Sequence, residues 1–170
     1  MTADIAVRPL ADTDRLAAFD CGVDEFNRWL KEYARRSAQQ DSARTHLAVG
    51  PREALYGYVA LTAGAVEHHH AAKRLSESMP RYPLPVVLLA RLAVDQSHQR
   101  RGVASALVRL SMEITVQTAQ RVGVRGLAVD ADNDAVAAFY ERLGFARARP
   151  GSLKLQVPTH ILRGLLGTDA

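Results

Sequence analysis

The sequence has 170 residues, of which 48% are hydrophobic and 24% charged, and its formal net charge is +4. This length suits one domain with its own core, and the composition excludes a disordered chain. The positive charge favours an anionic substrate or partner, while the single cysteine, Cys21, excludes an internal disulfide. Neither a signal peptide nor an apolar run long enough to span a membrane is present, so we expect a cytoplasmic protein with one domain, residues 1–170.

The first half of the chain predicts a helix, a pair of strands and a loop. Apolar residues recur at helical spacing in residues 22–40, where Asp24 is the predicted N-cap. The apolar segments at 44–50 and 55–63 flank a turn-rich PREA and predict two paired strands. The polar segment at 67–85 contains three prolines, which predict an irregular connection.

The second half alternates between strand and helix patterns. The run VVLLARLAVD predicts a buried strand because it is continuously aliphatic and β-branched, apart from Arg91. We expect, in order, a strand at 86–95, a turn at 96–102, an amphipathic helix from 103, a strand at 124–130, a helix at 132–145 with Gly144 as C-cap, and a strand at 152–157. This order predicts a mixed α/β domain built on one sheet.

The segment QRRGVASAL at 99–107 joins a predicted buried strand to a predicted helix. The first amides of a helix have no intrahelical partner and attract anions, and Gly102 lets a ligand approach the backbone. Two arginines before the glycine add positive charge. The segment lacks the glycines of the Walker and dinucleotide loops. Taken alone, it is equally well explained as a solvated, basic start of a helix.

The surrounding sequence gives this segment a more specific meaning. Gln99, Gly102 and Ala104 match the pattern Gln/Arg-x-x-Gly-x-Gly/Ala, directly after a strand that ends in RLAVD. About thirty residues later, NDAVAAFYERLGF supplies Asn133 and Tyr140. Together these features resemble the acyl-CoA loop and the last sequence block of the GNAT superfamily of acetyltransferases. The resemblance implies the GNAT fold, a single mixed and mostly antiparallel sheet flanked by helices, and an N-acetyltransferase that uses acetyl-CoA without a metal.

The resemblance also implies roles for individual residues. Tyr140 is the expected catalytic residue, a general acid that protonates the departing thiolate, since the reference pKa of a phenol (~10) lies above that of a thiol (~8.5). The alternative for Tyr140 is a core aromatic. The residues expected to bind acetyl-CoA are Leu92, Ala93, Val94, Gln99, Arg100, Arg101, Gly102, Val103, Ala104, Ser105, Asn133 and Phe139.

The resemblance narrows to GNAT toxins of type II toxin–antitoxin modules and covers almost the whole chain. Its most specific part is the proline-interrupted MPRYPLPVVLLARLAVD, whereas Arg100 and Ala104 depart from the glycine-rich loop of these toxins. The subfamily transfers acetyl from acetyl-CoA to the free α-amine of aminoacyl-tRNA and so blocks translation. It implies neutralisation by a ribbon-helix-helix antitoxin, binding of operator DNA through the antitoxin complex, and a homodimer.

Basic residues are the candidates for contacts with tRNA phosphates. An arginine in an apolar strand is costly unless it is partnered, so we expect Arg91 to lie near the substrate. Any other single basic residue can equally be solvated surface. The sequence offers Lys31, Arg35, Arg36, Arg44, Lys73, Arg74, Arg81 and Arg91, of which we assign Arg91, Arg35, Arg36 and Arg74.

The three consecutive histidines at 68–70 are expected to lie on the surface rather than to bind a metal. Adjacent histidines should point apart, and no cysteine or acidic cluster completes a ligand set. No acidic residue stands out as a general base. Two other functions stay open at this point: a GNAT enzyme acting on a small-molecule or protein amine, and a non-catalytic acetyl-CoA-binding co-repressor.

Overall fold

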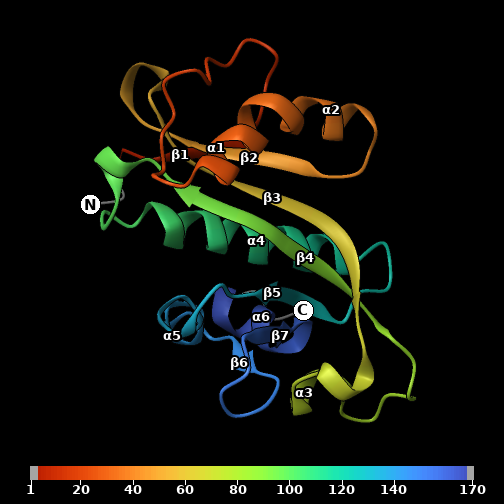
Figure 1. Ribbon diagram of the computed structural model, residues 1–170. Helices are drawn as coiled ribbons and strands as arrows, with labels where there is room; N and C mark the ends of the chain where they lie inside the picture. Colours follow the sequence, from red (N-terminus) through yellow and green to blue (C-terminus); the bar gives the residue numbers. More distant parts are fainter. Residues whose placement is uncertain (1–3, 168–170) are drawn as a thin grey trace. The chain divides into compact units, whose positions relative to one another are not determined.

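The structure is a computed structural model that describes residues 4–167, and the chain packs as two compact units. The N-terminal unit comprises the described residues up to Thr62 together with Ala90–Leu110, and the C-terminal unit comprises Ala63–Leu89 and the described residues from Ser111. Three elements continue from one unit into the other (Figure 1): β3 (Leu55–Val66), β4 (Leu84–Val94) and α4 (Val103–Ala119). That the chain is a single domain stays a prediction.

The strands form a seven-stranded sheet in the order β1-β2-β3-β4-β5-β7-β6. The other strands are β1 (Ala6–Pro9), β2 (Arg44–Val49), β5 (Gly126–Asp130), β6 (Ala146–Arg147) and β7 (Lys154–Pro158). β4 and β5 are parallel, whereas β1 with β2, β2 with β3, β5 with β7 and β6 with β7 pair antiparallel. The expected fold class, a mixed and mostly antiparallel sheet with flanking helices, is confirmed.

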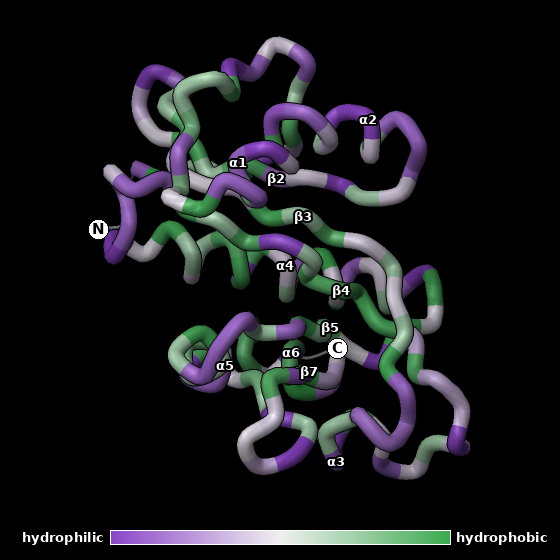
Figure 2. Tube along the Cα trace, viewed as in Figure 1, coloured by the Kyte–Doolittle hydropathy of each residue, from purple (hydrophilic) through white to green (hydrophobic). Residues whose placement is uncertain are grey.

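The predicted first helix forms in the N-terminal unit as α1 (Asp24–Arg28), a π-helical turn (Trp29–Tyr33) and α2 (Ala34–Gln39). Its buried face includes Leu30 and Ala34 and packs in the same core as Leu47 of β2. Figure 2 shows α2 as a largely hydrophilic segment, as expected for a helix that buries one side only. The predicted N-cap was wrong by one residue, because Val23 has the extended backbone of the cap and Asp24 is already helical.

The C-terminal unit contains three further helices, α3 (Lys73–Ser76), α5 (Asp134–Arg142) and α6 (Thr159–Leu166). α3 lies within the segment predicted to be irregular, and α6 was not predicted. α6 contacts β5 and β7, and α5 contacts β6 and β7. Gly144 follows the actual C-cap of α5, Leu143, and takes the positive φ of +108° that ends many helices.

None of the helices within residues 4–167 is both long and apolar enough to cross a membrane. α4 is 17 residues long and carries charged residues such as Arg109 and Glu113.

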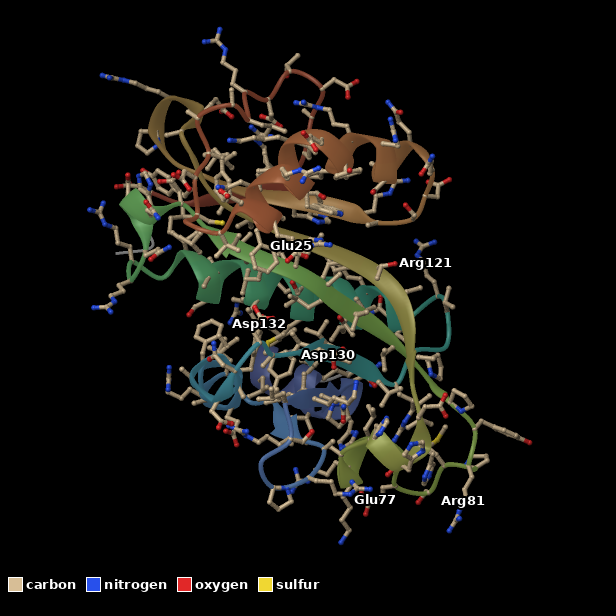
Figure 3. The ribbon with its side chains drawn as sticks, in the orientation of Figure 1. Glu25, Glu77, Arg81, Arg121, Asp130 and Asp132 are labelled. Carbon is tan, nitrogen blue, oxygen red and sulfur yellow. The ribbon has the colours of Figure 1, made fainter. Side chains whose placement is uncertain are left out.

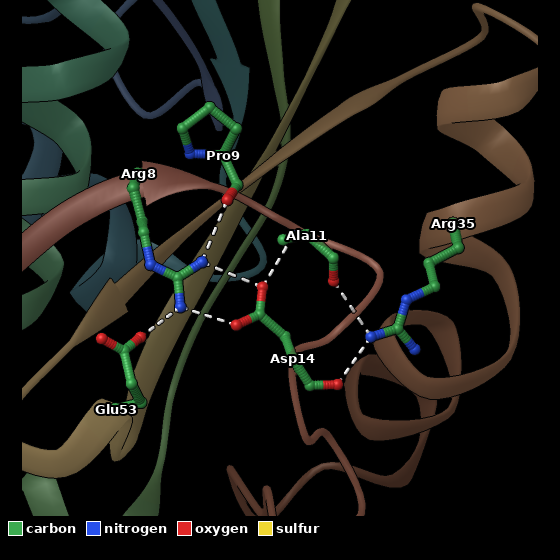
Figure 4. A network of polar contacts seen from close by, with 6 residues as sticks. All are labelled: Arg8, Pro9, Ala11, Asp14, Arg35 and Glu53. Atoms are coloured by element: carbon green, nitrogen blue, oxygen red, sulfur yellow. Dashed lines mark hydrogen bonds and ion pairs between the residues drawn. The ribbon is translucent and has the colours of Figure 1, made fainter.

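A network of charged side chains fastens the start of the chain to the N-terminal unit (Figure 4). The Arg8 guanidinium donates to both carboxylate oxygens of Asp14, at 2.9 and 2.6 Å, and to Glu53 at 2.6 Å. Arg35 of α2 donates to the backbone oxygens of Asp14 and Ala11, at 2.6 and 3.2 Å. Hydrogen bonds from Arg8 hold the pKa of Asp14 below its ordinary value, so the charged carboxylate stabilises the fold.

Asp14→Asn should lower the free energy of unfolding by about 2 kcal/mol at neutral pH, because hydrogen bonds to a charged, largely buried group are lost. Since the pKa of Asp14 is lower in the native state, its contribution is complete above the unfolded pKa of about 4 and disappears as the pH falls through the native value. Denaturant titrations of both proteins from pH 7 down to pH 2 should therefore converge. The matched control is Glu53→Gln, because Glu53 bonds the same guanidinium but its side chain is 72% exposed. Equal losses in the two variants at pH 7 would contradict this account.

Candidate functional site

The turn between β4 and α4 is closed by side chains that bond to backbone groups. The Gln99 carboxamide donates to the carbonyl oxygens of Val94, at 3.1 Å, and Cys21, at 3.4 Å. Asp95 accepts from the backbone amides of Ser97, at 2.9 Å, and Asp20, at 3.0 Å. Gln99, expected to bind acetyl-CoA, therefore holds the turn in shape through its side chain.

The closed turn has the backbone geometry of an anion site. Arg100 has a φ of +62° and Gly102 a φ of +83°, directly before α4 begins at Val103. The N-terminus of the helix that follows has free backbone amides, which attract anions. The side chains of Arg100 and Arg101 are exposed. Of the predicted loop residues, Gln99–Gly102 thus lie in the turn, and Val103, Ala104 and Ser105 form the start of α4.

β4 extends beyond its pairing with β5. The paired residues are Val86–Leu89 with Gly126–Val129, and β4 continues through Ala90–Val94. The Asp95 amide donates to Tyr56 of β3, so by strand alternation the backbone groups of Leu92 and Val94 face away from β3. The amides of Leu92 and Val94 have no strand partner among the described residues. Of the three residues expected here to bind acetyl-CoA, Leu92 and Val94 therefore have outward backbone groups, whereas those of Ala93 face β3.

Gly57 of β3 permits the close packing behind this stretch. A Cβ at position 57 would lie 2.8 Å from the carbonyl oxygen of Ala93 and 3.1 Å from the side chain of Val103. The first contact is with backbone and cannot be relieved by a rotamer change. Gly57 therefore lets β3, β4 and the start of α4 approach one another, a role that the sequence alone did not indicate.

Arg91 lies at a cavity of about 390 Å³ in the N-terminal unit, together with Asp24, Glu25, Arg28, Trp29 and Tyr33. Its guanidinium carbon is 5.2 Å from the ring centroid of Trp29 and 5.8 Å from that of Phe26. One guanidinium nitrogen is 3.5 Å from the Glu25 carboxylate. These partners explain how an arginine side chain that is only 26% exposed is accommodated in an apolar strand.

Part of the wall of the Arg91 cavity is the π-helical turn Trp29–Tyr33, and the rest of it includes residues of α1. π-Helical turns are rare and are frequent at functional sites. Trp29 stacks on Tyr58, whose hydroxyl donates to the Phe26 backbone oxygen at 2.8 Å. From the sequence, Trp29 and Tyr33 belong to the apolar residues at helical spacing in 22–40, which predicted a packed helix face and not this wall. Glu25, one residue after the predicted N-cap, could have indicated from the sequence that Arg91 has a charged partner on this helix.

Tyr140 lies on α5 in the C-terminal unit and is 3% exposed. Its ring contacts Phe139 and Phe145 edge-on, at centroid distances of 5.1 and 5.2 Å. Burial, with a smaller effect of the Asp132 carboxylate labelled in Figure 3, raises the pKa of the Tyr140 phenol. The hydroxyl donates to no other residue within 4–167, so it is protonated and free to donate a hydrogen bond to a ligand.

The remaining predicted residues have other contacts in the structure. Asn133 is the N-cap of α5, where its side-chain oxygen accepts from the Val136 amide at 3.0 Å. Arg35 is half-buried and bonds backbone oxygens in the network of Figure 4, whereas Arg36 is exposed. Arg74 is exposed on α3. That Arg35, Arg36 and Arg74 contact a substrate stays a prediction.

The three histidines form a short 3-10 turn, His68–His70. The expectation that adjacent histidines point apart was wrong, because this turn brings the rings of His69 and His70 to a centroid distance of 4.1 Å. Within the described part of the chain, no group of three or more His, Cys, Asp or Glu side chains is arranged to hold a metal ion. That the protein uses no metal stays a prediction.

Comparison with known proteins finds the same family that the sequence motifs resemble. The model of the acetyltransferase (GNAT) family matches residues 17–145. A tRNA-acetylating toxin of Mycobacterium tuberculosis is 32% identical over 167 residues, which cover 98% of this chain and 99% of the toxin.

Solved structures are similar over nearly the whole chain. A tyrosine-to-phenylalanine mutant of KacT is 30% identical with a TM-score of 0.88, covering 95% of this chain and 99% of that one. AtaT complexed with acetyl-methionyl-tRNAfMet is 29% identical with a TM-score of 0.85, covering 96% and 99%. Further structures with TM-scores of 0.79 and 0.76 are AtaTR bound with acetyl-CoA and the AtaT–AtaR complex bound to DNA, 29% and 26% identical.

Gln99→Ala should raise the KM for acetyl-CoA about 3- to 10-fold, because the variant loses two hydrogen bonds that shape the anion-binding turn. The matched control is Gln96→Ala, since the Gln96 carboxamide makes no hydrogen bond within residues 4–167. Steady-state kinetics at saturating acceptor should show a shift for position 99 alone. An unchanged KM for the Gln99 variant would contradict the role given to this side chain.

Proposed function

Because the chain belongs to the acetyltransferase (GNAT) family, we propose that it is a toxin that transfers acetyl from acetyl-CoA to the free α-amine of aminoacyl-tRNA. The observation that carries the proposal is the continuous stretch of the N-terminal unit from Arg91 to Ser105. Along this stretch, a cavity with a partnered arginine is followed by strand amides that have no partner in β5 and by a turn that leads into the N-terminus of α4. The near full-length similarity to a tRNA-acetylating toxin supports the acceptor.

Acetyl-CoA fits the chemistry of these residues. The turn and helix start at Gln99–Ser105 offer the free amides of the helix N-terminus and the Arg100 and Arg101 side chains to the pyrophosphate. The outward amides of Leu92 and Val94 suit the amide groups of the pantetheine arm. Asn133 and Phe139 are proposed to complete the binding residues from α5. AtaTR, solved with acetyl-CoA, supports this assignment by its similarity.

The acceptor is proposed to enter at the Arg91 cavity. Its aromatic lining of Trp29 and Tyr33 can hold an apolar side chain or the terminal base, while Arg91 and Glu25 offer opposite charges at one place. Arg35, Arg36 and Arg74 are proposed as contacts to tRNA phosphates elsewhere. AtaT complexed with acetyl-methionyl-tRNAfMet supports this substrate class.

The reaction follows from these groups. The neutral α-amine attacks the thioester carbonyl carbon, while an N–H group of Leu92 or Val94, the two that face away from β3, stabilises the oxyanion. The tetrahedral intermediate collapses by breaking the carbon–sulfur bond, and the amine proton leaves to solvent. Tyr140 supplies a proton to the departing thiolate and regains one from solvent. The products are the N-acetylated aminoacyl-tRNA and coenzyme A.

The similar complexes also support partners for this chain. AtaT is solved with its antitoxin AtaR, and their complex is solved bound to DNA. We therefore propose that an antitoxin of the ribbon-helix-helix class neutralises this protein and that the complex binds operator DNA. A homodimer and a cytoplasmic location complete the proposal.

Incubation with acetyl-CoA and charged tRNA should yield N-acetylated aminoacyl-adenosine, detected by mass spectrometry after nuclease digestion. Tyr140→Phe should lower kcat about 10²- to 10⁴-fold, because the proton donor is removed, and leave the dissociation constant of acetyl-CoA unchanged. The control is Tyr82→Phe, since Tyr82 is 68% exposed. Acetylation of polyamines or lysine peptides but not of charged tRNA would overturn the proposed acceptor. Full growth inhibition by Tyr140→Phe would favour a non-catalytic co-repressor.

Arg91→Lys should raise the KM for charged tRNA about 5- to 10-fold and leave the KM for acetyl-CoA unchanged. Lysine keeps the charge but loses the planar group that stacks on Trp29 and Phe26. The control is Arg28→Lys, because Arg28 lines the same cavity with an exposed side chain paired to Glu32. If both KM values rise together in the Arg91 variant, its role is structural.

A further inference from the structure

Tyr140 has an acidic neighbour to which the proposed reaction gives no role. Asp132 lies between β5 and α5, directly before Asn133, the N-cap of α5. Burial and, to a smaller extent, the Asp132 carboxylate raise the pKa of the Tyr140 phenol, so the carboxylate acts at close range on the proposed proton donor. All three residues belong to the C-terminal unit, which places the carboxylate and the phenol relative to each other.

The geometry of α5 brings the Tyr140 side chain toward Asp132. Tyr140 follows the N-cap Asn133 by seven residues, or two helical turns, so the two residues lie on one face of the helix. Two turns rise by only about 10 Å. Side chains on a helix lean toward its N-terminus, and a tyrosine that leans this way covers much of that distance. The phenol therefore extends toward the segment that carries Asp132.

The Tyr140 ring is buried, but its hydroxyl is accessible. The residue is 3% exposed, and its ring contacts Phe139 and Phe145. The hydroxyl makes no hydrogen bond within residues 4–167, yet it is not one of the buried side-chain atoms there that lack a partner. The oxygen therefore reaches solvent at the edge of the core. The Asp132 side chain is exposed as well, so a ligand can reach both groups.

Asp132 differs from the other acidic residues of β5, α5 and the segment between them. Each of the other three is paired with a basic residue of β6 or β7. The pairs are Asp134–Arg147, Glu141–Arg147 and Asp130–Lys154, at 2.9, 3.0 and 3.3 Å. Asp132 forms no ion pair or hydrogen bond within residues 4–167. Its carboxylate is therefore available to accept a hydrogen bond from a ligand.

The chemistry of acetyl transfer brings the attacking nitrogen close to Tyr140. In the tetrahedral intermediate, the nitrogen of the acceptor and the sulfur of coenzyme A are bonded to the same carbon. A phenol that protonates this sulfur lies about 3 Å from it, and the nitrogen is the next atom but one. A carboxylate beside that phenol is consequently within reach of the N–H groups of the amine. Hydrogen bonds to a charged acceptor are stronger than those to a neutral one.

We propose that Asp132 binds the α-amine of the acceptor and takes its proton. One carboxylate oxygen accepts a hydrogen bond from the amine and holds the nitrogen beside the thioester. The nitrogen lone pair forms the bond to carbon, the carbonyl π electrons move to oxygen, and the surplus proton on nitrogen passes to Asp132. The carbon–sulfur bond then breaks, the sulfur takes the Tyr140 proton, and the Asp132 proton leaves to solvent. The inference rests on the proposed function and adds to it the residue through which the amine proton leaves.

The test compares Asp132→Asn with the wild-type protein in the acetylation of charged tRNA. The variant should lower kcat/KM for the acceptor about 10²-fold, because the proton acceptor is lost. The dissociation constant of acetyl-CoA should stay unchanged, because Asp132 is assigned to the acceptor alone. In Asp132→Ala, added formate should restore much of the lost rate, since a free carboxylate can occupy the vacated place. A purely structural role of Asp132 would not respond to formate.

Asp130→Asn is the matched control, because both aspartates are exposed, lie two residues apart and are labelled in Figure 3, but Asp130 is paired with Lys154. It should leave kcat/KM unchanged, as expected for a surface ion pair. Equal rates for the Asp132→Asn and Asp130→Asn variants, or no rescue by formate, would overturn the inference. If the wild-type protein acetylates polyamines or lysine peptides but no charged tRNA, the proposed acceptor is wrong. The same variants assayed on that amine then decide the role of Asp132.

Discussion

The Gln99 carboxamide donates to the carbonyl oxygens of Val94 and Cys21, and these hydrogen bonds fix the turn on which the proposed chemistry depends. They join the end of β4, the start of α4 and the segment before α1. The backbone at Arg100 and Gly102 has positive φ, and the free amides of the helix N-terminus follow directly, where we propose that the pyrophosphate binds. Gly57 allows the same region to pack closely, because any side chain there would meet the Ala93 oxygen. A strained turn is thus stabilised by contacts from three separate segments.

The main elements of the fold could be predicted because their patterns are strong. The aliphatic run at 86–95 and the helical spacing at 22–40 both form as expected, within two residues at their ends. β1 and β6 were not predicted, because strands of four and two residues are too short to show a period. α6 had a usable signal in its apolar spacing and in Gly167, which ends it with a φ of +71°. α3 depends on bonds from Gln156 and Arg125, which are distant in sequence.

The candidate site was predictable where the chemistry lies in consecutive residues. The turn from Gln99 to Ser105 and the position of Tyr140 follow from motifs, although the part that the Gln99 side chain plays in closing the turn required the structure. The partners of Arg91 could not be named from sequence, because Glu25 and Trp29 reach it from another element.

In the proposed function, the stretch from Leu92 to Ser105 binds acetyl-CoA. Hydrogen–deuterium exchange with and without acetyl-CoA can detect this binding, because the proposed contacts are made largely by backbone amides. Exchange should slow at Leu92 and Val94 and through the turn into the first residues of α4, and it should stay unchanged in β1 and β2. Protection confined to other segments, with none at the β4–α4 turn, would contradict it.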